Sequence, residues 1–223
     1  MSPGLFGVLG GTFDPVHYGH LRAADAVRAR LALDAVALVP AGRPSHRGAP
    51  GASAEDRLAM LELGVREFPG LAVDAREIAR PGPSYTVPTL ESMRAEAPQR
   101  HLALILGSDA FAGLPTWHRW QALFDLAHLV VVTRPGFEPV FDREPLASEF
   151  RARRVDDPAR LESARAGSIY LLPIPPQPIS STAVRQGLAR GSDGQAAVRA
   201  MVPPAVLAYI DRHALYRPPP DAS

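Results

Sequence analysis

The chain has 223 residues and a formal net charge of +1, with 46% hydrophobic and 21% charged residues, the proportions of an ordinary globular protein. A charge balance this close to neutral predicts neither nucleic acid nor an anionic membrane as a partner. The sequence lacks Cys, which excludes disulfides, thiolate nucleophiles and Cys-ligated zinc, and it lacks Lys, which excludes a Walker-type phosphate loop and a Schiff-base lysine.

Six short apolar runs, each the length of a strand, recur along the chain at residues 5–9, 35–39, 71–73, 102–106, 129–132 and 169–172. Helical patterns lie between most of them at residues 54–68, 87–97 and 117–124, and a closing amphipathic helix is expected over 203–216. Apolar strands alternating with helices predict an α/β fold, a single doubly wound, mostly parallel sheet with helices on both faces. Ligands of such sheets bind at the carboxyl ends of the strands.

The remaining segments have less pattern. Residues 42–53 are rich in Gly, Pro, Ser and Ala and predict a flexible loop after the second strand. Residues 135–167 are Pro-rich and then charged, and predict a helical excursion or a mobile loop anchored by Phe141 and Phe150. We expect one domain over residues 1–217 and a disordered tail over 218–223. Because the apolar runs are too short to span a bilayer and the N-terminus has no signal-peptide pattern, a cytoplasmic location is expected.

The most informative stretch follows the first strand. It reads Gly10-Gly11-Thr12-Phe13-Asp14-Pro15-Val16-His17-Tyr18-Gly19-His20. The two adjacent glycines have no Cβ, so phosphates can approach the backbone closely. A helix predicted to begin near Gly19 offers N–H groups and the positive end of its dipole to an anion. If that helix begins between His17 and His20, both imidazoles face one ligand, and the stretch predicts a phosphate site. A glycine turn or a His-x-x-His pair alone is more often only structural.

A second stretch, Ile179–Arg185, follows the last strand and a Pro-rich turn. Ser180 or Ser181 is a good N-cap, so hydroxyl and N–H groups would face the same crevice as the first stretch. Arg185 lies one turn further on and could bring a charged fork to a phosphate. Taken alone, this stretch is equally well explained as a capped helix with a surface Arg.

Together the two stretches resemble the Gly-x-Phe-Asp-Pro-x-His-x-Gly-His and Ile-Ser-Ser-Thr-x-Ile-Arg signatures of nucleotidyltransferases related to class I aminoacyl-tRNA synthetases. Position 184 is Val where that signature has Ile. The resemblance implies a Rossmann-like nucleotidyltransferase fold and Mg²⁺ accompanying ATP, with no protein carboxylate cage for the ion. It implies catalytic roles for His17, His20 and Arg185. The ATP-binding residues that it implies are Gly10, Gly11, Thr12, Phe13, His17, His20, Gly107, Ser180, Ser181 and Arg185.

Four further stretches are similar to motifs of the bacterial nicotinate-nucleotide adenylyltransferases. They are Pro40–Arg47, Ser84–Thr86, Gly107–Asp109 with Thr116–His118, and Arg134–Gly136. In the first, Ser45 replaces a Pro, Arg47 replaces a Lys, and Gly42 stands where the family commonly has Asn. The resemblance implies adenylyl transfer from ATP to nicotinate mononucleotide, giving nicotinate adenine dinucleotide and pyrophosphate in NAD biosynthesis. The acceptor-binding residues that it implies are His46, Arg47, Tyr85, Thr86, Asp109, Trp117 and Arg134.

Some of these acceptor residues also have a purely structural explanation. Trp117 could be a half-buried core aromatic, Asp109 a helix cap and Arg134 a solvated strand end. The other histidines, His101, His118, His128 and His213, are expected to be structural or surface residues. Two alternative functions stay open: the same chemistry on phosphopantetheine or nicotinamide mononucleotide, and a non-catalytic nucleotide-binding module. The chain could act as a monomer or as a homo-oligomer.

Overall fold

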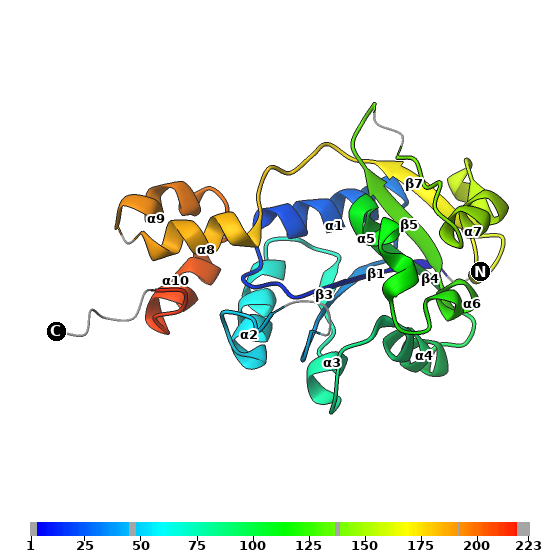
Figure 1. Ribbon diagram of the computed structural model, residues 1–223. Helices are drawn as coiled ribbons and strands as arrows, with labels where there is room; N and C mark the ends of the chain where they lie inside the picture. The colour runs from blue at the N-terminus through cyan, green and yellow to red at the C-terminus, as the bar shows by residue number, and fades with distance from the viewer. Residues whose placement is uncertain (1–3, 45–47, 137–138, 191, 218–223) are drawn as a thin grey trace. The chain divides into compact units, whose positions relative to one another are not determined.

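The structure is a computed structural model that describes residues 4–44, 48–136, 139–190 and 192–217 (Figure 1). Its strands are β1 (Leu5–Gly11), β2 (Val36–Pro40), β3 (Leu71–Val73), β4 (His101–Gly107), β5 (His128–Thr133), β6 (Arg154–Val155) and β7 (Ile169–Pro173). Each of the six apolar runs is therefore a strand, to within two residues at either end. The sequence pattern missed β6, which has only two residues.

The seven strands form one sheet in the order β3-β2-β1-β4-β5-β7-β6. The chain runs outward from β1 to β3 and then resumes with β4 on the other side of β1. This reversal is the kind of switch point at which α/β sheets bind ligands. The pairs β1–β4, β4–β5, β5–β7 and β6–β7 are all parallel. The predicted doubly wound, parallel α/β sheet is confirmed.

The helices are α1 (Tyr18–Arg30), α2 (Ala54–Val65), α3 (Arg76–Ala79), α4 (Thr86–Glu96), α5 (Ser108–Ala112), α6 (Leu123–Leu126), α7 (Leu146–Arg153), α8 (Ser181–Ala189), α9 (Ser192–Arg199) and α10 (Pro204–Arg212). Short 3₁₀ turns cover Leu114–Thr116, Trp120–Ala122 and Pro158–Leu161. The prediction of one helix over residues 117–124 is wrong. Arg119 has a φ of +52°, which interrupts any right-handed helix, and a 3₁₀ turn and α6 follow it instead.

The segment 135–167, which the sequence left between two alternatives, contains α7, β6 and a 3₁₀ turn. Phe111 of α5 packs edge-on against Phe141 and Phe150, with ring centroids 4.7 and 6.0 Å apart. The two phenylalanines of the segment are themselves 5.1 Å apart. The helical alternative is therefore correct, and both expected anchors are confirmed.

Contacts divide the chain into two compact units, each made of three chain segments. The first contains Met1–Gly10, Ala24–Leu38 and Tyr85–Pro176, and the second contains Gly11–Ala23, Val39–Ser84 and Gln177–Ser223. The single domain expected over 1–217 stays a prediction, and the expected tail lies outside the described residues. None of the helices in the described ranges is long and apolar enough to cross a membrane.

Candidate active site

The first motif, which we call the Gly10–His20 motif, carries two stacked imidazoles. Helix α1 begins at Tyr18, so the start of the helix lies between His17 and His20. Their ring centroids are 3.7 Å apart and the ring planes differ by 23°. Phe13, which is 2% exposed, presents its ring edge-on to His20 at 5.1 Å. The two histidines thus form one imidazole surface, as the spacing predicted.

Gly19 is required by the position of the His17 ring. A Cβ atom at this position would lie 2.8 Å from both Cε1 and Nδ1 of His17 and 3.2 Å from the carbonyl oxygen of Ile179. Because His17 is only 3% exposed, its ring has little room to move away. This contact gives a physical reason for the glycine in the His-x-Gly-His pattern.

Burial makes His17 a neutral donor. It lowers the pKa of His17 to about 4, because the charged imidazolium would lose its hydration. The Nδ1 atom of this ring is buried and has no hydrogen-bond partner among the described residues. An anionic ligand could satisfy such a nitrogen and would favour its protonation.

The start of α1 offers less to an anion than the sequence suggested. The N–H of Tyr18 donates to the carbonyl oxygen of Met201 at 2.8 Å, and the N–H of His20 donates to the carbonyl oxygen of His17 at 3.0 Å. These two backbone donors are therefore engaged within the protein. The imidazoles and the second motif remain as candidate donors to an anionic ligand.

The second motif, Ile179–Arg185, lies directly against the first. Ser180 caps α8 by accepting a hydrogen bond from the N–H of Ala183 at 3.2 Å. The hydroxyl of Ser181 donates to the carbonyl oxygen of Pro15 at 3.1 Å. Arg185 donates from Nη1 to the carbonyl oxygen of Asp14 at 2.6 Å, and its side chain remains 35% exposed. The fork of Arg185 is thus tied at one end to the first motif while still accessible to a ligand.

Asp14 is the centre of a network that sequence reasoning missed. It is 6% exposed and accepts hydrogen bonds from the N–H of Gly51 at 2.8 Å and the hydroxyl of Tyr216 at 2.7 Å. Nη1 of Arg185 lies 3.6 Å from its Oδ2. The sequence shows the carboxylate of Asp14 inside the motif, but it does not show the hydrogen-bond partners, which lie up to 202 residues away.

Arg57 is a second residue that the sequence did not single out. This guanidinium, on α2, is 1% exposed and donates to the carbonyl oxygens of Thr12 at 2.8 Å and Gly42 at 3.2 Å. Burial lowers its pKa, and the nearby Asp14 acts in the opposite direction. Arg57 therefore fixes the backbone of the Gly10–His20 motif to the segment that follows β2.

Ser84 and Glu77 constrain the backbone at Gly42, the position where the family commonly has Asn. Its hydroxyl accepts from the N–H of Gly42 at 2.9 Å and of Arg43 at 3.2 Å, and Pro44 and Ser84 form a parallel bridge. A Cβ atom on Gly42 would lie 2.5 Å from the carbonyl oxygen of Glu77. The Asn common at this position would therefore need a shifted backbone. The adjacent candidates His46 and Arg47 lie outside the described residues.

Three further candidates lie at the carboxyl ends of neighbouring strands in the first unit. β4 and β5 pair with Gly107 opposite Val132, so Asp109 in the first turn of α5 and Arg134 just after β5 share one edge. Both of these side chains are exposed. Gly107 is the last residue of β4 and Gly10 is the last but one of its parallel neighbour β1, and a Cβ atom on either would meet nothing within 4 Å.

Two other acceptor candidates, Tyr85 and Thr86, lie at the start of α4. Tyr85 precedes this helix and stacks on His118, with centroids 4.5 Å apart, and Thr86 is its first residue. Trp117 is half-buried, whereas Trp120 is the buried tryptophan of this segment. His118, expected to be a structural or surface residue, is exposed and contacts a candidate residue.

Comparison with known proteins places this geometry in a family. The cytidylyltransferase-like family model matches residues 8–187. A protein of Pseudomonas syringae pv. tomato named "Probable nicotinate-nucleotide adenylyltransferase" is 49% identical over 97% of this chain and 96% of its own. One of the same name from Aeromonas hydrophila is 46% identical over 95% and 97%. The chain belongs to the nicotinate-nucleotide adenylyltransferase family.

The fold of this adenylyltransferase also agrees with a solved structure. Plasmodium falciparum nicotinic acid mononucleotide adenylyltransferase complexed with NaAD has a TM-score of 0.70 over 96% of this chain and 97% of its own. The sequence identity is 17%, so this likeness bears on the fold alone.

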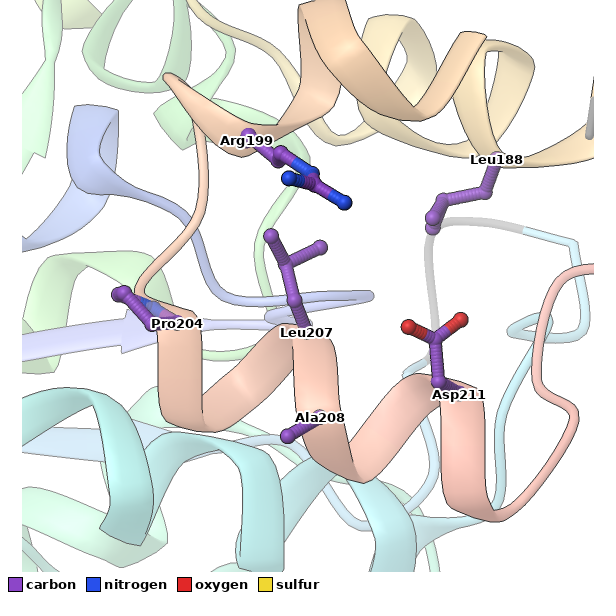
Figure 2. A pocket seen from close by; sticks show the side chains of 6 residues that line it. All are labelled: Leu188, Arg199, Pro204, Leu207, Ala208 and Asp211. Carbon is purple, nitrogen blue, oxygen red and sulfur yellow. The ribbon is translucent and has the colours of Figure 1, made fainter. Parts of the chain in front are cut away.

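A separate pocket of the adenylyltransferase contains none of the candidate residues. It has a volume of about 400 Å³ and lies among α8, α9 and α10 (Figure 2). Its lining residues are Leu188, Arg199, Pro204, Leu207, Ala208 and Asp211. Figure 2 shows Leu207 of α10 directed toward Arg199 and Leu188 pointing into the same space. No residue of the two motifs lines this pocket. Its lining residue Leu188 belongs to α8 but lies beyond Arg185, the last residue of the second motif.

Proposed function

We propose that this nicotinate-nucleotide adenylyltransferase holds the triphosphate of ATP with His17, His20, Ser180 and Arg185 while it transfers the adenylyl group to nicotinate mononucleotide. The products are nicotinate adenine dinucleotide and pyrophosphate. One observation carries the proposal: the stacked imidazoles and the tethered Arg185 come from two motifs that pack against each other. Thr12, Phe13, Ser181 and the backbone of Gly10, Gly11 and Gly107 would complete the ATP contacts.

The proposed adenylyl transfer requires mainly that the protein position the two substrates. The attacking group is a phosphate oxygen that is already ionised, so no general base is needed. Catalysis then consists of aligning this oxygen in line with the α-phosphorus and stabilising the charge that develops on pyrophosphate. Neutral donors and a fixed guanidinium that exist before ATP binds perform the second task without reorganisation.

On the acceptor side, we propose that Trp117 stacks on the pyridine ring. Thr86, Tyr85 and nearby backbone N–H groups would bind the carboxylate, and Asp109 would bind a ribose hydroxyl or orient a neighbour. His46, Arg47 and Arg134 would lie near the phosphate of the mononucleotide. The exposure of Asp109 and Arg134 in the ligand-free protein is compatible with these roles.

We further propose that Mg²⁺ enters with ATP, held by phosphate oxygens and water. The described ranges contain no group of three or more His, Asp or Glu side chains that could hold a metal. The carboxylate inside the Gly10–His20 motif, Asp14, already accepts from Gly51 and Tyr216. A substrate-borne ion fits these residues. We also propose a cytoplasmic enzyme with small-molecule substrates, as a monomer or homo-oligomer, without nucleic-acid or membrane partners.

The test is release of pyrophosphate from ATP with a panel of acceptors. We expect turnover with nicotinate mononucleotide, much less with nicotinamide mononucleotide, and none with phosphopantetheine or without acceptor. Mass spectrometry should identify nicotinate adenine dinucleotide as the product. Preference for another acceptor would move the enzyme to a different substrate group, and binding of ATP without turnover on any acceptor would make it a nucleotide-binding module.

A further inference from the structure

A tyrosine close to the C-terminal end of the described chain, Tyr216, forms a hydrogen bond with the Gly10–His20 motif. The hydroxyl of Tyr216 donates to Oδ1 of Asp14 at 2.7 Å, although the two residues are 202 positions apart. The backbone of Tyr216 has a φ of +59°, a conformation that residues with a Cβ rarely adopt. Strain of this kind persists where surrounding contacts enforce it.

The carboxylate of Asp14 divides its two oxygens between different partners. Oδ1 accepts from Tyr216, whereas Oδ2 accepts from the N–H of Gly51 at 2.8 Å and faces Nη1 of Arg185 at 3.6 Å. Arg185 spends its short hydrogen bond on the backbone carbonyl of Asp14 rather than on the carboxylate. The arrangement thus keeps the guanidinium beside Asp14 without a close two-point ion pair.

Tyr216 is a permanent donor in this arrangement. Burial and the hydrogen bond to the Asp14 carboxylate both raise the pKa of the phenol. Its ring also packs against Gly51, where an added Cβ atom would lie 3.1 Å from Cε1 of Tyr216. The chain end and this loop are therefore both attached to Asp14.

We propose that Tyr216 is a positioning residue for ATP, acting through Asp14 on Arg185; this rests on the proposed function of Arg185. With its hydroxyl in place, Oδ1 is satisfied and Asp14 does not compete with the triphosphate for the fork of Arg185. Without the hydroxyl, Oδ1 loses a partner, and the carboxylate gains by drawing Arg185 into a close, bidentate pair. ATP would then have to break that pair before it could bind.

The matched test compares Tyr216→Phe with Tyr209→Phe. Tyr209 lies on α10, and its hydroxyl donates to Oδ1 of Asp56 at 2.9 Å, so both variants lose one tyrosine–aspartate hydrogen bond in the same part of the chain. Asp56 lies on α2, where its other hydrogen bonds are with Ser53, the N-cap of that helix. We expect Tyr216→Phe to raise KM for ATP by about threefold to tenfold and to leave KM for nicotinate mononucleotide unchanged. Tyr209→Phe should change neither constant.

Titration of α,β-methylene-ATP into both variants supplies a readout independent of turnover. The dissociation constant should rise by a similar factor for Tyr216→Phe and stay at the unmodified value for Tyr209→Phe. Equal effects of the two variants on KM and on thermal stability would overturn the proposal, because Tyr216 would then be only structural. An unmodified enzyme that fails to use nicotinate mononucleotide would instead refute the proposed function, while the analogue titration would still test the link from Tyr216 to Arg185.

Discussion

His17 and Asp14 of the Gly10–His20 motif are 3% and 6% exposed and lie in a dense set of ring contacts and hydrogen bonds. On the acceptor side, Asp109 and Arg134 are exposed, and Trp117 is half-buried. The first region is thus fixed by contacts within the protein, whereas the second keeps its side chains in contact with solvent. This difference agrees with the roles that we propose, because charge developing on pyrophosphate requires fixed donors, while an unreactive ring requires only contact.

The largest expected effect comes from removing a fixed donor. His20→Ala should lower turnover by about two to three orders of magnitude, the usual cost of one lost transition-state donor. The matched control is His213→Ala, which removes an exposed imidazole stacked on Tyr209 at 4.1 Å. Steady-state kinetics and thermal unfolding of both variants check the prediction. Near-normal turnover in a folded His20→Ala protein would remove His20 from the phosphate site.

The acceptor side can be sharpened by the choice between nicotinate and nicotinamide mononucleotides. Thr86 opens an 11-residue helix, and such an end offers N–H donors and positive potential. A carboxylate satisfies these donors, whereas a carboxamide leaves some of them unpaired at about 1–3 kcal/mol each. We expect a preference for nicotinate on the order of a hundredfold in kcat/KM. Comparable values for the two mononucleotides would contradict this account.

Arg119 provides a control for that preference. It is the nearest basic residue to the Thr116–His118 stretch, and its Nη2 pairs with Oε1 of Glu91 at 2.8 Å. Because this guanidinium already has a carboxylate partner, Arg119→Ala should leave the preference for nicotinate intact. A preference that collapses in this variant would assign the carboxylate to Arg119 instead of to backbone N–H groups.

Removing the proposed stacking partner should affect binding of one substrate only. Trp117→Ala should raise KM for nicotinate mononucleotide about tenfold, in line with the contribution of an aromatic stack to a base. KM for ATP should change much less, and Trp117→Phe should restore most of the affinity. Equal weakening of both substrates would show that Trp117 supports the fold rather than the acceptor.

The smallest effect concerns pH and the buried imidazole of the fixed region. The pKa of His17 is about 4 in the folded protein and near 6.5 in the unfolded chain. The unfolded state therefore binds more protons between these values, and the free energy of unfolding falls as the pH is lowered through that window. Acidification from pH 7 to pH 5.5 should cost about 1 kcal/mol through His17. Denaturant unfolding should show a shallower decline for His17→Asn, and an identical decline would refute the burial argument.

Much of the fold follows from local sequence pattern. The strands β2, β4 and β5 were predictable because they are buried along nearly their whole length, and burial on both sheet faces selects apolar residues. The runs that form β3 and β7 are only partly buried and were found by their short apolar pattern alone. The two-residue β6 has no such signal. The helix expected over 117–124 failed because the left-handed backbone of Arg119 is set by its surroundings and not by its residue type.

The site divides in the same way. The Gly10–His20 motif and Arg185 could be singled out because they resemble the nucleotidyltransferase signatures in residue type and local spacing. Asp14, Arg57 and Tyr216 act through hydrogen bonds to distant segments, and single residues of these types have no distinguishing pattern. The start of the first helix was expected to offer N–H groups to an anion, but the carbonyl of Met201 accepts from the N–H of Tyr18 there. Such a contact cannot be read from sequence spacing.

The contrast between the two regions depends on the proposed phosphate-binding residues His17, His20 and Arg185 lying in place before nicotinate mononucleotide binds. Its most direct test is isothermal titration of α,β-methylene-ATP into the enzyme in the absence of any mononucleotide. We expect α,β-methylene-ATP to bind the free enzyme. Its affinity should fall about tenfold or more in Arg185→Ala, which removes a charged donor, and should be unchanged in Trp117→Ala. Binding that appears only after nicotinate mononucleotide is added, or that Trp117→Ala weakens as much as Arg185→Ala, would contradict this account.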